Sequence, residues 1–182
     1  MGEGKAAMPL FGGKTRPKLD GLTKDEEKLR DALNPEVLRR AGEKGVAGQM
    51  PAAAAILREK TDTEATNSLW PLLLGWQMRA MHRFDQSVEA FQETIRRAPN
   101  EIRAYFGAGN AYWDAAQARV TAAPDAPLTG VMSELTLENL FHEAKRNFTR
   151  AMDLAEDKEE RERLRNAISN VDTMLAKRAG RL

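Results

Sequence analysis

Residues 74–78 read LGWQM and residues 108–112 read AGNAY, and in both stretches a glycine stands second. The two glycines, Gly75 and Gly109, are 34 positions apart, which is the length of one helix-turn-helix repeat unit. Met78 and Tyr112 hold the same place, three residues after each glycine. This spacing predicts a helical repeat protein, a class that usually binds its partner along stacked helices.

A second set of residues recurs along the chain at a longer but constant interval. Each pair is separated by 57 positions, which exceeds the 34-residue period by 23: Phe84 and Phe141, Ser87 and Ala144, Phe91 and Phe148, Thr94 and Ala151. One offset shared by four pairs indicates a repeat unit that carries an insertion of 23 residues. Small residues in such a pattern let neighbouring helices approach, and large ones fill the space between them.

These stretches resemble the tetratricopeptide repeat, in which an aromatic-x-x-Leu-Gly-x-x-Tyr helix is followed by an Ala-x-x-x-Phe helix and a closing proline. In the first copy, Leu74-Gly75 and Phe91 fit this pattern and Pro99 closes the unit, while the aromatic residue stands one place early, at Trp70. The resemblance implies an all-α fold: a short tetratricopeptide-like helical repeat (α-solenoid) with a C-terminal capping helix.

The resemblance also divides the chain into segments. We expect a flexible N-terminal arm over residues 1–24 and a helical domain over residues 25–178. Within the domain, the expected units are a degenerate repeat (34–67), a repeat (68–101), a second repeat (102–156) with an inserted segment at about 114–136, and a capping helix (157–178). An apolar stripe from Leu164 to Leu175, at spacings of three and four, predicts that this last segment is helical.

Short signals predict where some helices begin. Thr23 with Glu26 three places later has the form of a capping box and predicts the start of a helix. Asn34-Pro35 supplies a cap and a first helical residue, so a new helix is expected there. Thr136 is the expected cap of a long helix in the second repeat.

In the family that the chain resembles, the first helix of each repeat lines a concave groove. The positions carried over onto this chain form the expected partner-binding site: Leu69, Leu72, Trp76, Arg79, Arg103, Phe106, Asn110 and Trp113. Aromatic and arginine side chains dominate the energetics of protein interfaces. A second interpretation is equally open, namely that Trp76, Phe106 and Trp113 pack against neighbouring helices or the insertion.

The segment from Thr121 to Ser133 contains two prolines and a glycine and is the clearest loop in the sequence. Loops longer than about 12–15 residues are uncommon in compact domains and are often functional. Two interpretations are open: a lid whose apolar residues, such as Met132 and Leu135, fold over the groove, or a surface insertion that costs little closure entropy.

The composition fits one α-helical domain, because 42% of the 182 residues are apolar. The formal net charge of +1 gives no general attraction to nucleic acid, although Lys5, Lys14, Arg16 and Lys18 make the first residues locally basic. No stretch reaches the roughly 18 apolar residues of a membrane span, so the expected location is cytoplasmic. The absence of cysteine excludes disulfides and thiol chemistry.

Two strings resemble catalytic motifs and fail on spacing. Gly12-Gly13-Lys14-Thr15 lacks the earlier glycine of a phosphate-binding loop, and no strand is predicted before it. His142-Glu143 begins a zinc-protease motif, but arginine stands where the second histidine is required. With two histidines and no cysteine, we expect no catalytic residues, no metal and no cofactor, and hence no enzyme.

The expected function is a non-enzymatic adaptor or assembly factor that holds a partner polypeptide in an aromatic groove. An amphipathic helix or an apolar segment suits such a groove. Among the positions that clamp a chaperone's C-terminal carboxylate in this family, only Arg103 is charged here, so that ligand is not expected. Two alternatives remain: an oligomeric scaffold that self-associates through its repeat ends, and a nucleic-acid-associated protein that uses its basic arm.

Overall fold

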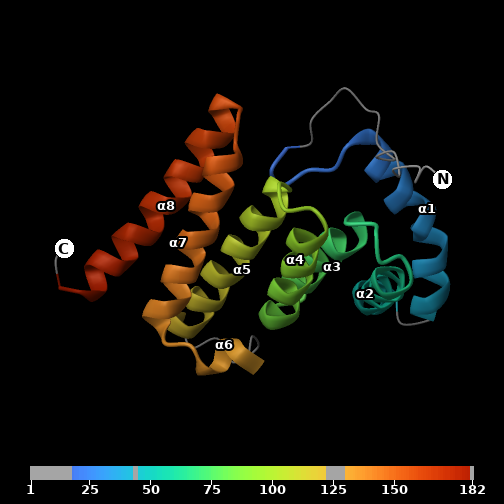
Figure 1. Cartoon of the computed structure of the whole chain (residues 1–182). Helices are drawn as coiled ribbons and strands as arrows, with labels where there is room; N and C mark the ends of the chain where they lie inside the picture. The colour runs from blue at the N-terminus through green and yellow to red at the C-terminus, as the bar shows by residue number, and fades with distance from the viewer. Residues whose placement is uncertain (1–17, 43–44, 122–129, 181–182) are drawn as a thin grey trace, which may run out of the picture.

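In the computed structural model of the chain, the described residues are 18–42, 45–121 and 130–180, and they form helices joined by turns (Figure 1). The helices are α1 (Lys24–Ala41), α2 (Gly45–Thr63), α3 (Leu69–Ala80), α4 (Phe84–Arg97), α5 (Ile102–Thr121), α6 (Gly130–Glu134), α7 (Leu137–Leu154) and α8 (Lys158–Arg178). The prediction of an all-α chain is confirmed for this part of the sequence. None of these helices is long and apolar enough to cross a membrane.

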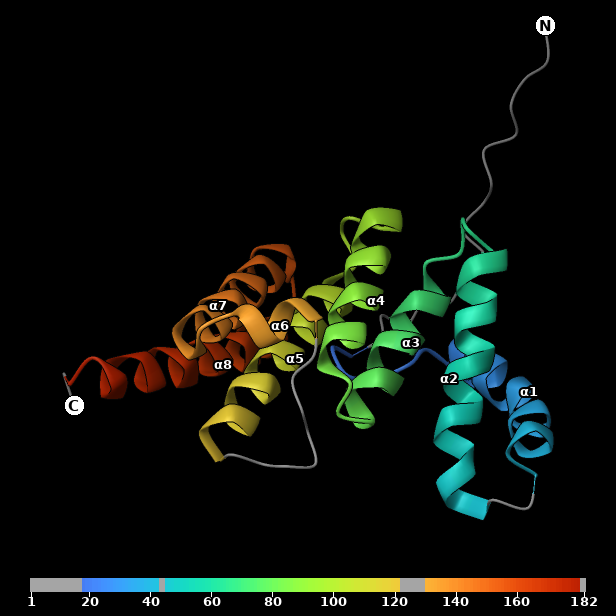
Figure 2. The same cartoon turned by 90° about the horizontal axis from the view of Figure 1, so that it is seen from below.

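Each long helix packs on its neighbour in the chain. The pairs are α1 with α2, α2 with α3, α3 with α4, α4 with α5, α5 with α7, and α7 with α8. In addition, α3 contacts α5, and the short α6 contacts α4. Figures 1 and 2 show the resulting row, which runs from α1 at one end to α8 at the other. The largest cluster of buried side chains lies among α4, α5, α7 and α8.

The glycines of the repeated stretches are places where a helix meets a phenylalanine ring. A Cβ atom added at Gly75 would lie 2.7 Å from the ring of Phe91, and one at Gly109 would lie 2.6 Å from the ring of Phe148. A Cβ atom at Gly107 would lie 2.3 Å from the same ring of Phe91. Because protein interiors are close-packed, any larger side chain at these positions would force the helices apart.

Two helix starts were predicted in the region of α1, and the structure confirms one of them. Thr23 Oγ1 accepts a hydrogen bond from the backbone N–H of Glu26 at 3.2 Å, and the Glu26 carboxylate accepts one from the N–H of Thr23 at 2.7 Å, so the capping box is confirmed. The predicted new start at Asn34-Pro35 is wrong, because α1 continues through Pro35. The ring of proline holds φ near the helical value, and α1 is supported by its packing on α2.

The end of the inserted segment is fastened to the helices around it. Met132 is buried, and its backbone N–H donates to Asp85 Oδ1 at 2.9 Å, at the start of α4. The Arg119 guanidinium of α5 donates to backbone carbonyls in and just after α6. Thr136 caps α7 as predicted, because its Oγ1 accepts a hydrogen bond from the backbone N–H of Asn139 at 3.1 Å. Most of the expected loop, residues 122–129, lies outside the described part of the chain.

The residues just before α1 are held against the helices. Residues 18–23, which we call the N-terminal strap, cross from the start of α1 to the start of α5 (Figure 1). Leu19 is 0% exposed and belongs to the largest buried cluster, and Asp20 Oδ2 forms an ion pair with Arg163 of α8 at 2.9 Å. The expected boundary of the arm near residue 24 is therefore too late, and the rest of the expected arm, residues 1–17, lies outside the described part.

Candidate functional site

Three large aromatic side chains stand along one side of α3 and α5. Trp76, Phe106 and Trp113 are each half-buried, and the ring centres of Trp76 and Phe106 lie 6.4 Å apart. Each ring also lies against a buried phenylalanine of the next long helix, α4 for Trp76 and α7 for the other two. The ring centres are 5.1 Å apart for Trp76 and Phe91, 5.8 Å for Phe106 and Phe148, and 5.6 Å for Trp113 and Phe141. Each ring is therefore packed on one side against a buried phenylalanine and open on the other. The groove interpretation applies to the open side, and the packing interpretation applies to the packed side.

Helix spacing explains why the residues of α5 share this side. Phe106, Asn110 and Trp113 follow one another at intervals of four and three, so they lie on one face of the helix. Asn110 is half-buried, and its side-chain amide forms no hydrogen bond with another residue of the described chain. We call Trp76, Phe106, Asn110 and Trp113 the aromatic face. Its rings offer apolar contact, and its amide offers one donor group and one acceptor.

An ion pair joins the two helices at the edge of the aromatic face. Arg79 Nε donates to Asp114 Oδ2 at 2.6 Å, and both side chains are 31% exposed. The Arg79 guanidinium also lies 5.8 Å from the centre of the Trp76 ring. Arg79 is thus fixed in place. Sequence reasoning missed Asp114, although its position four residues after Asn110 places it on the same side of α5.

Three of the expected site residues are not accessible. Leu69 and Leu72 are buried with Phe91 in the core between α3, α4 and α5. Arg103 is 5% exposed, because the start of α1 and the N-terminal strap cover it. The expectation that these three side chains line a groove is corrected: they stabilise the helices beneath or beside the aromatic face.

The environment of Arg103 is an ionic cluster. Its guanidinium donates to Glu26 from both Nη atoms, at 2.8 Å and 3.0 Å, and to the Glu101 carboxylate at 2.8 Å and 2.9 Å. A further contact reaches the carbonyl of Gly21 in the strap at 3.4 Å. Burial raises the pKa of Glu26, but the hydrogen bonds from Arg103 and from the backbone of Thr23 outweigh it and lower that pKa overall. Glu26 is therefore charged at neutral pH.

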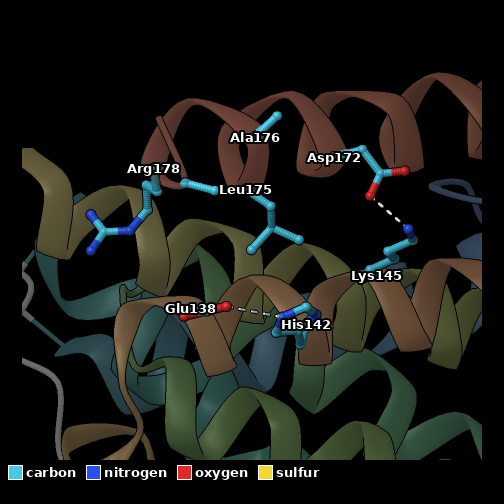
Figure 3. Close-up of a pocket in the computed structure, with 8 residues that line it drawn as sticks. Glu138, His142, Lys145, Asp172, Leu175, Ala176 and Arg178 are labelled. Carbon is cyan, nitrogen blue, oxygen red and sulfur yellow. Dashed lines mark hydrogen bonds and ion pairs between the residues drawn. The ribbon is translucent and has the colours of Figure 1, made fainter. Parts of the chain in front are cut away.

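A second candidate is the cleft of about 470 Å³ between the start of α7 and the end of α8 (Figure 3). Four of its ionisable side chains are paired, since His142 Nε2 lies 3.6 Å from Glu138 and Lys145 Nζ lies 2.6 Å from Asp172, whereas Arg178 forms no ion pair with a described residue. Among the residues that the structure describes, no group of three histidines or carboxylates is arranged to hold a metal. Because most of its charged side chains are paired with each other, we do not select this cleft as the functional site.

Comparison of the chain with models of known protein families gives no match, and comparison with curated proteins gives none. Any assignment of function therefore depends on the geometry of the chain itself.

Proposed function

We propose that this chain is a non-enzymatic adaptor or assembly factor that binds a partner polypeptide on its aromatic face. The observation that carries the proposal is the row of Trp76, Phe106 and Trp113, which is anchored from behind and open in front. Binding requires side chains to lose rotational freedom, and rings that are already held by buried neighbours lose less of it. Such pre-ordered aromatic residues are typical anchors of protein interfaces.

The partner that suits this surface is an amphipathic helix or an apolar segment. Its apolar side chains would cover the rings, and Asn110 would hydrogen-bond a backbone or side-chain amide of the partner. The Arg79–Asp114 pair at the edge supplies a polar rim of the kind that surrounds most interface centres.

A tetratricopeptide-like repeat is part of the same proposal. The support is that Gly75 receives the ring of Phe91 and Gly109 receives the ring of Phe148, which are equivalent pairs once the 23-residue insertion is allowed for. In that arrangement, α3 and α5 would be the first helices of successive repeats, and the aromatic face would lie on the side where such repeats bind ligands. We place this activity in the cytoplasm.

The test is to compare partner recovery from the native host with two double variants. Trp76→Ala with Trp113→Ala removes the anchors of the aromatic face, whereas Leu38→Ala with Met50→Ala removes side chains that are 49% and 38% exposed on α1 and α2. We expect at least about tenfold lower recovery with the first variant, since truncating hot-spot residues costs about 2 kcal/mol or more, and no change with the second. Unchanged recovery with a folded aromatic-face variant would overturn the proposal.

Self-association is a second candidate function, and one observation favours it at one end of the row. Leu38 and Met50 expose apolar surface on α1 and α2, whereas the outward side of α8 is polar, with Arg161, Arg165 and Asn166 exposed. Sedimentation of the wild type and of a Leu38→Glu, Met50→Glu variant tests it. A dimer that is lost in the variant would support a scaffold role, and a monomer at all concentrations would exclude it.

A further inference from the structure

The N-terminal strap brings the beginning of the chain to the start of α5 (Figure 1). The backbone N–H of Gly21 donates to the carbonyl of Lys18 at 3.1 Å, so the chain reverses its direction over these residues. The carbonyl of Gly21 in turn accepts a hydrogen bond from Arg103 Nη1 at 3.4 Å. Lys18, the first described residue, therefore lies beside the first turns of α5.

Arg103 stands on the same side of α5 as the aromatic face. Phe106 follows it after three positions and Asn110 after seven, and residues at these intervals share one side of a helix. At about 1.5 Å per residue, the aromatic face extends over about 10 Å of α5, from Phe106 to Trp113. The part of the chain that precedes Lys18 thus starts from one end of this face.

Residues 1–17 lie outside the described part of the chain, and their sequence contains one continuous apolar stretch. Residues 6–11 read AAMPLF, and we call them the apolar run. A chain spans at most about 3.3–3.6 Å per residue, so the seven residues from Lys18 back to Phe11 reach up to about 23–25 Å. This reach is more than twice the length of the aromatic face, so every ring of the face is within it.

The apolar run has the chemistry that suits the aromatic face. Its methionine, leucine and phenylalanine side chains are apolar, as are the open sides of the rings. Pro9 has no backbone N–H, so one donor fewer would lose its bond to water against the rings. The proline ring also fixes φ before binding, which lowers the entropy that the run loses. The Asn110 side chain is able to bond the remaining backbone groups of the run.

The short connection strengthens even a weak contact of this kind. A short flexible linker holds a ligand at an effective concentration in the millimolar range. A contact with a Kd of about 1 mM between separate molecules would therefore be formed about half of the time within one chain. We propose that the apolar run of this same chain binds its aromatic face and competes there with the partner polypeptide. The competition rests on the proposed function, whereas the contact within the chain does not.

A spin label tests the contact in the full chain without any partner. The sequence has no cysteine, so Gly4→Cys carries a nitroxide label at one defined position, just before the apolar run. Such a label weakens the NMR signals of N–H groups that come close to it. In the ¹⁵N-labelled protein, the indole N–H signals of Trp76 and Trp113 should become at least about twofold weaker than after reduction of the label, because the contact is formed about half of the time.

Two double variants of the labelled protein show whether the apolar side chains cause this loss. Leu10→Ser with Phe11→Ser keeps the label and the connection but removes two apolar groups, and it should restore both signals. Lys14→Ser with Arg16→Ser removes two charges from the same part of the chain and should leave the loss unchanged. Full indole signals in the labelled wild type, or an equal loss in the Leu10→Ser, Phe11→Ser variant, would overturn the contact.

Partner recovery from the native host then tests the competition separately. A face that is free only half of the time binds about twofold more weakly, so Leu10→Ser with Phe11→Ser should raise the recovery of the partner by about twofold. Unchanged recovery despite the spin-label contact would overturn the competition. Recovery that depends on Trp76 and Trp113, without any spin-label contact, would overturn this inference and leave the proposed function standing. A spin-label contact in a chain that recovers no partner would do the reverse.

Discussion

Arg103 of α5 and Glu26 of α1 are 77 positions apart in the chain, and they meet in a two-point ion pair with Nη1–Oε2 and Nη2–Oε1 distances of 2.8 Å and 3.0 Å. Both side chains are 6% exposed. Glu26 also closes the capping box of α1, so one carboxylate begins the first helix and fastens it to the middle of the molecule.

Removal of the cation should destabilise the fold more than removal of one carboxylate. Arg103→Met leaves the buried Glu26 and the partly buried Glu101 without a cationic partner, and we expect a loss of about 3–5 kcal/mol in the free energy of unfolding. Glu26→Gln leaves Arg103 paired with Glu101 and should cost only about 1–3 kcal/mol. Urea unfolding measures both, with Arg30→Gln as an exposed control that should change stability by less than about 1 kcal/mol. Equal losses for the two buried variants would contradict this order.

Stability should fall in acid through the carboxylates that arginines hold. Hydrogen bonds from Arg96 and then Arg97 lower the pKa of Glu93 to about 2, from an ordinary value of 4.5. Because the folded pKa is the lower one, the contribution of Glu93 is complete above about pH 4.5 and is lost as the pH falls toward 2. Thermal midpoints should therefore separate wild type from Glu93→Gln at pH 7, and the two should converge near pH 2. A constant difference at every pH would rule out this origin.

Gly109→Ala should destabilise the protein although alanine is the better helix former. The added Cβ would lie 2.6 Å from the fully packed ring of Phe148, and overpacking of this kind costs about 1–3 kcal/mol, more than the gain of about 1 kcal/mol in helix propensity. Phe148→Leu introduced into the Gly109→Ala protein should recover part of the loss. If the two changes are additive in denaturant unfolding, the ring is not the cause.

Pro35→Ala should stabilise α1. The change restores a backbone N–H that bonds the carbonyl of Asp31 inside the helix, and the expected gain is about 1–2 kcal/mol after the greater freedom of the unfolded chain is subtracted. Pro99→Ala, in the turn after α4, is the matched control and should not stabilise. A gain in both variants, or in neither, would show that the helical position of Pro35 has no special cost.

The helices α3, α4, α5 and α7 were predictable because their signal is local, whereas α6 lies in the segment that was expected to be a loop. The sequence has small and large residues at fixed intervals, namely Gly75 with Phe91 and Gly109 with Phe148. In the structure these residues do lie against each other. The predicted helix start at Pro35 was wrong because a proline indicates only its own φ and the loss of its N–H donor. Whether the helix continues past it depends on packing against α2.

The candidate site was predictable only in part, for a related reason. Helix spacing identifies the side on which Leu72 and Trp76 lie, but the width of the buried stripe depends on which other segment covers it. Arg103 is covered by residues more than seventy positions away in the sequence, and no local sequence pattern predicts that contact.

The N-terminal strap gives this row of helices a different folding behaviour from a simple stack. In a stack, every contact is between neighbours, and the end units can fray while the middle stays folded. Here Leu19, Asp20 and Gly21 join the beginning of the chain to α5 and α8, over sequence separations of up to 143 residues. Contacts between residues so far apart in the sequence form slowly, and we expect them to make the first and last helices open together with the core in one cooperative transition.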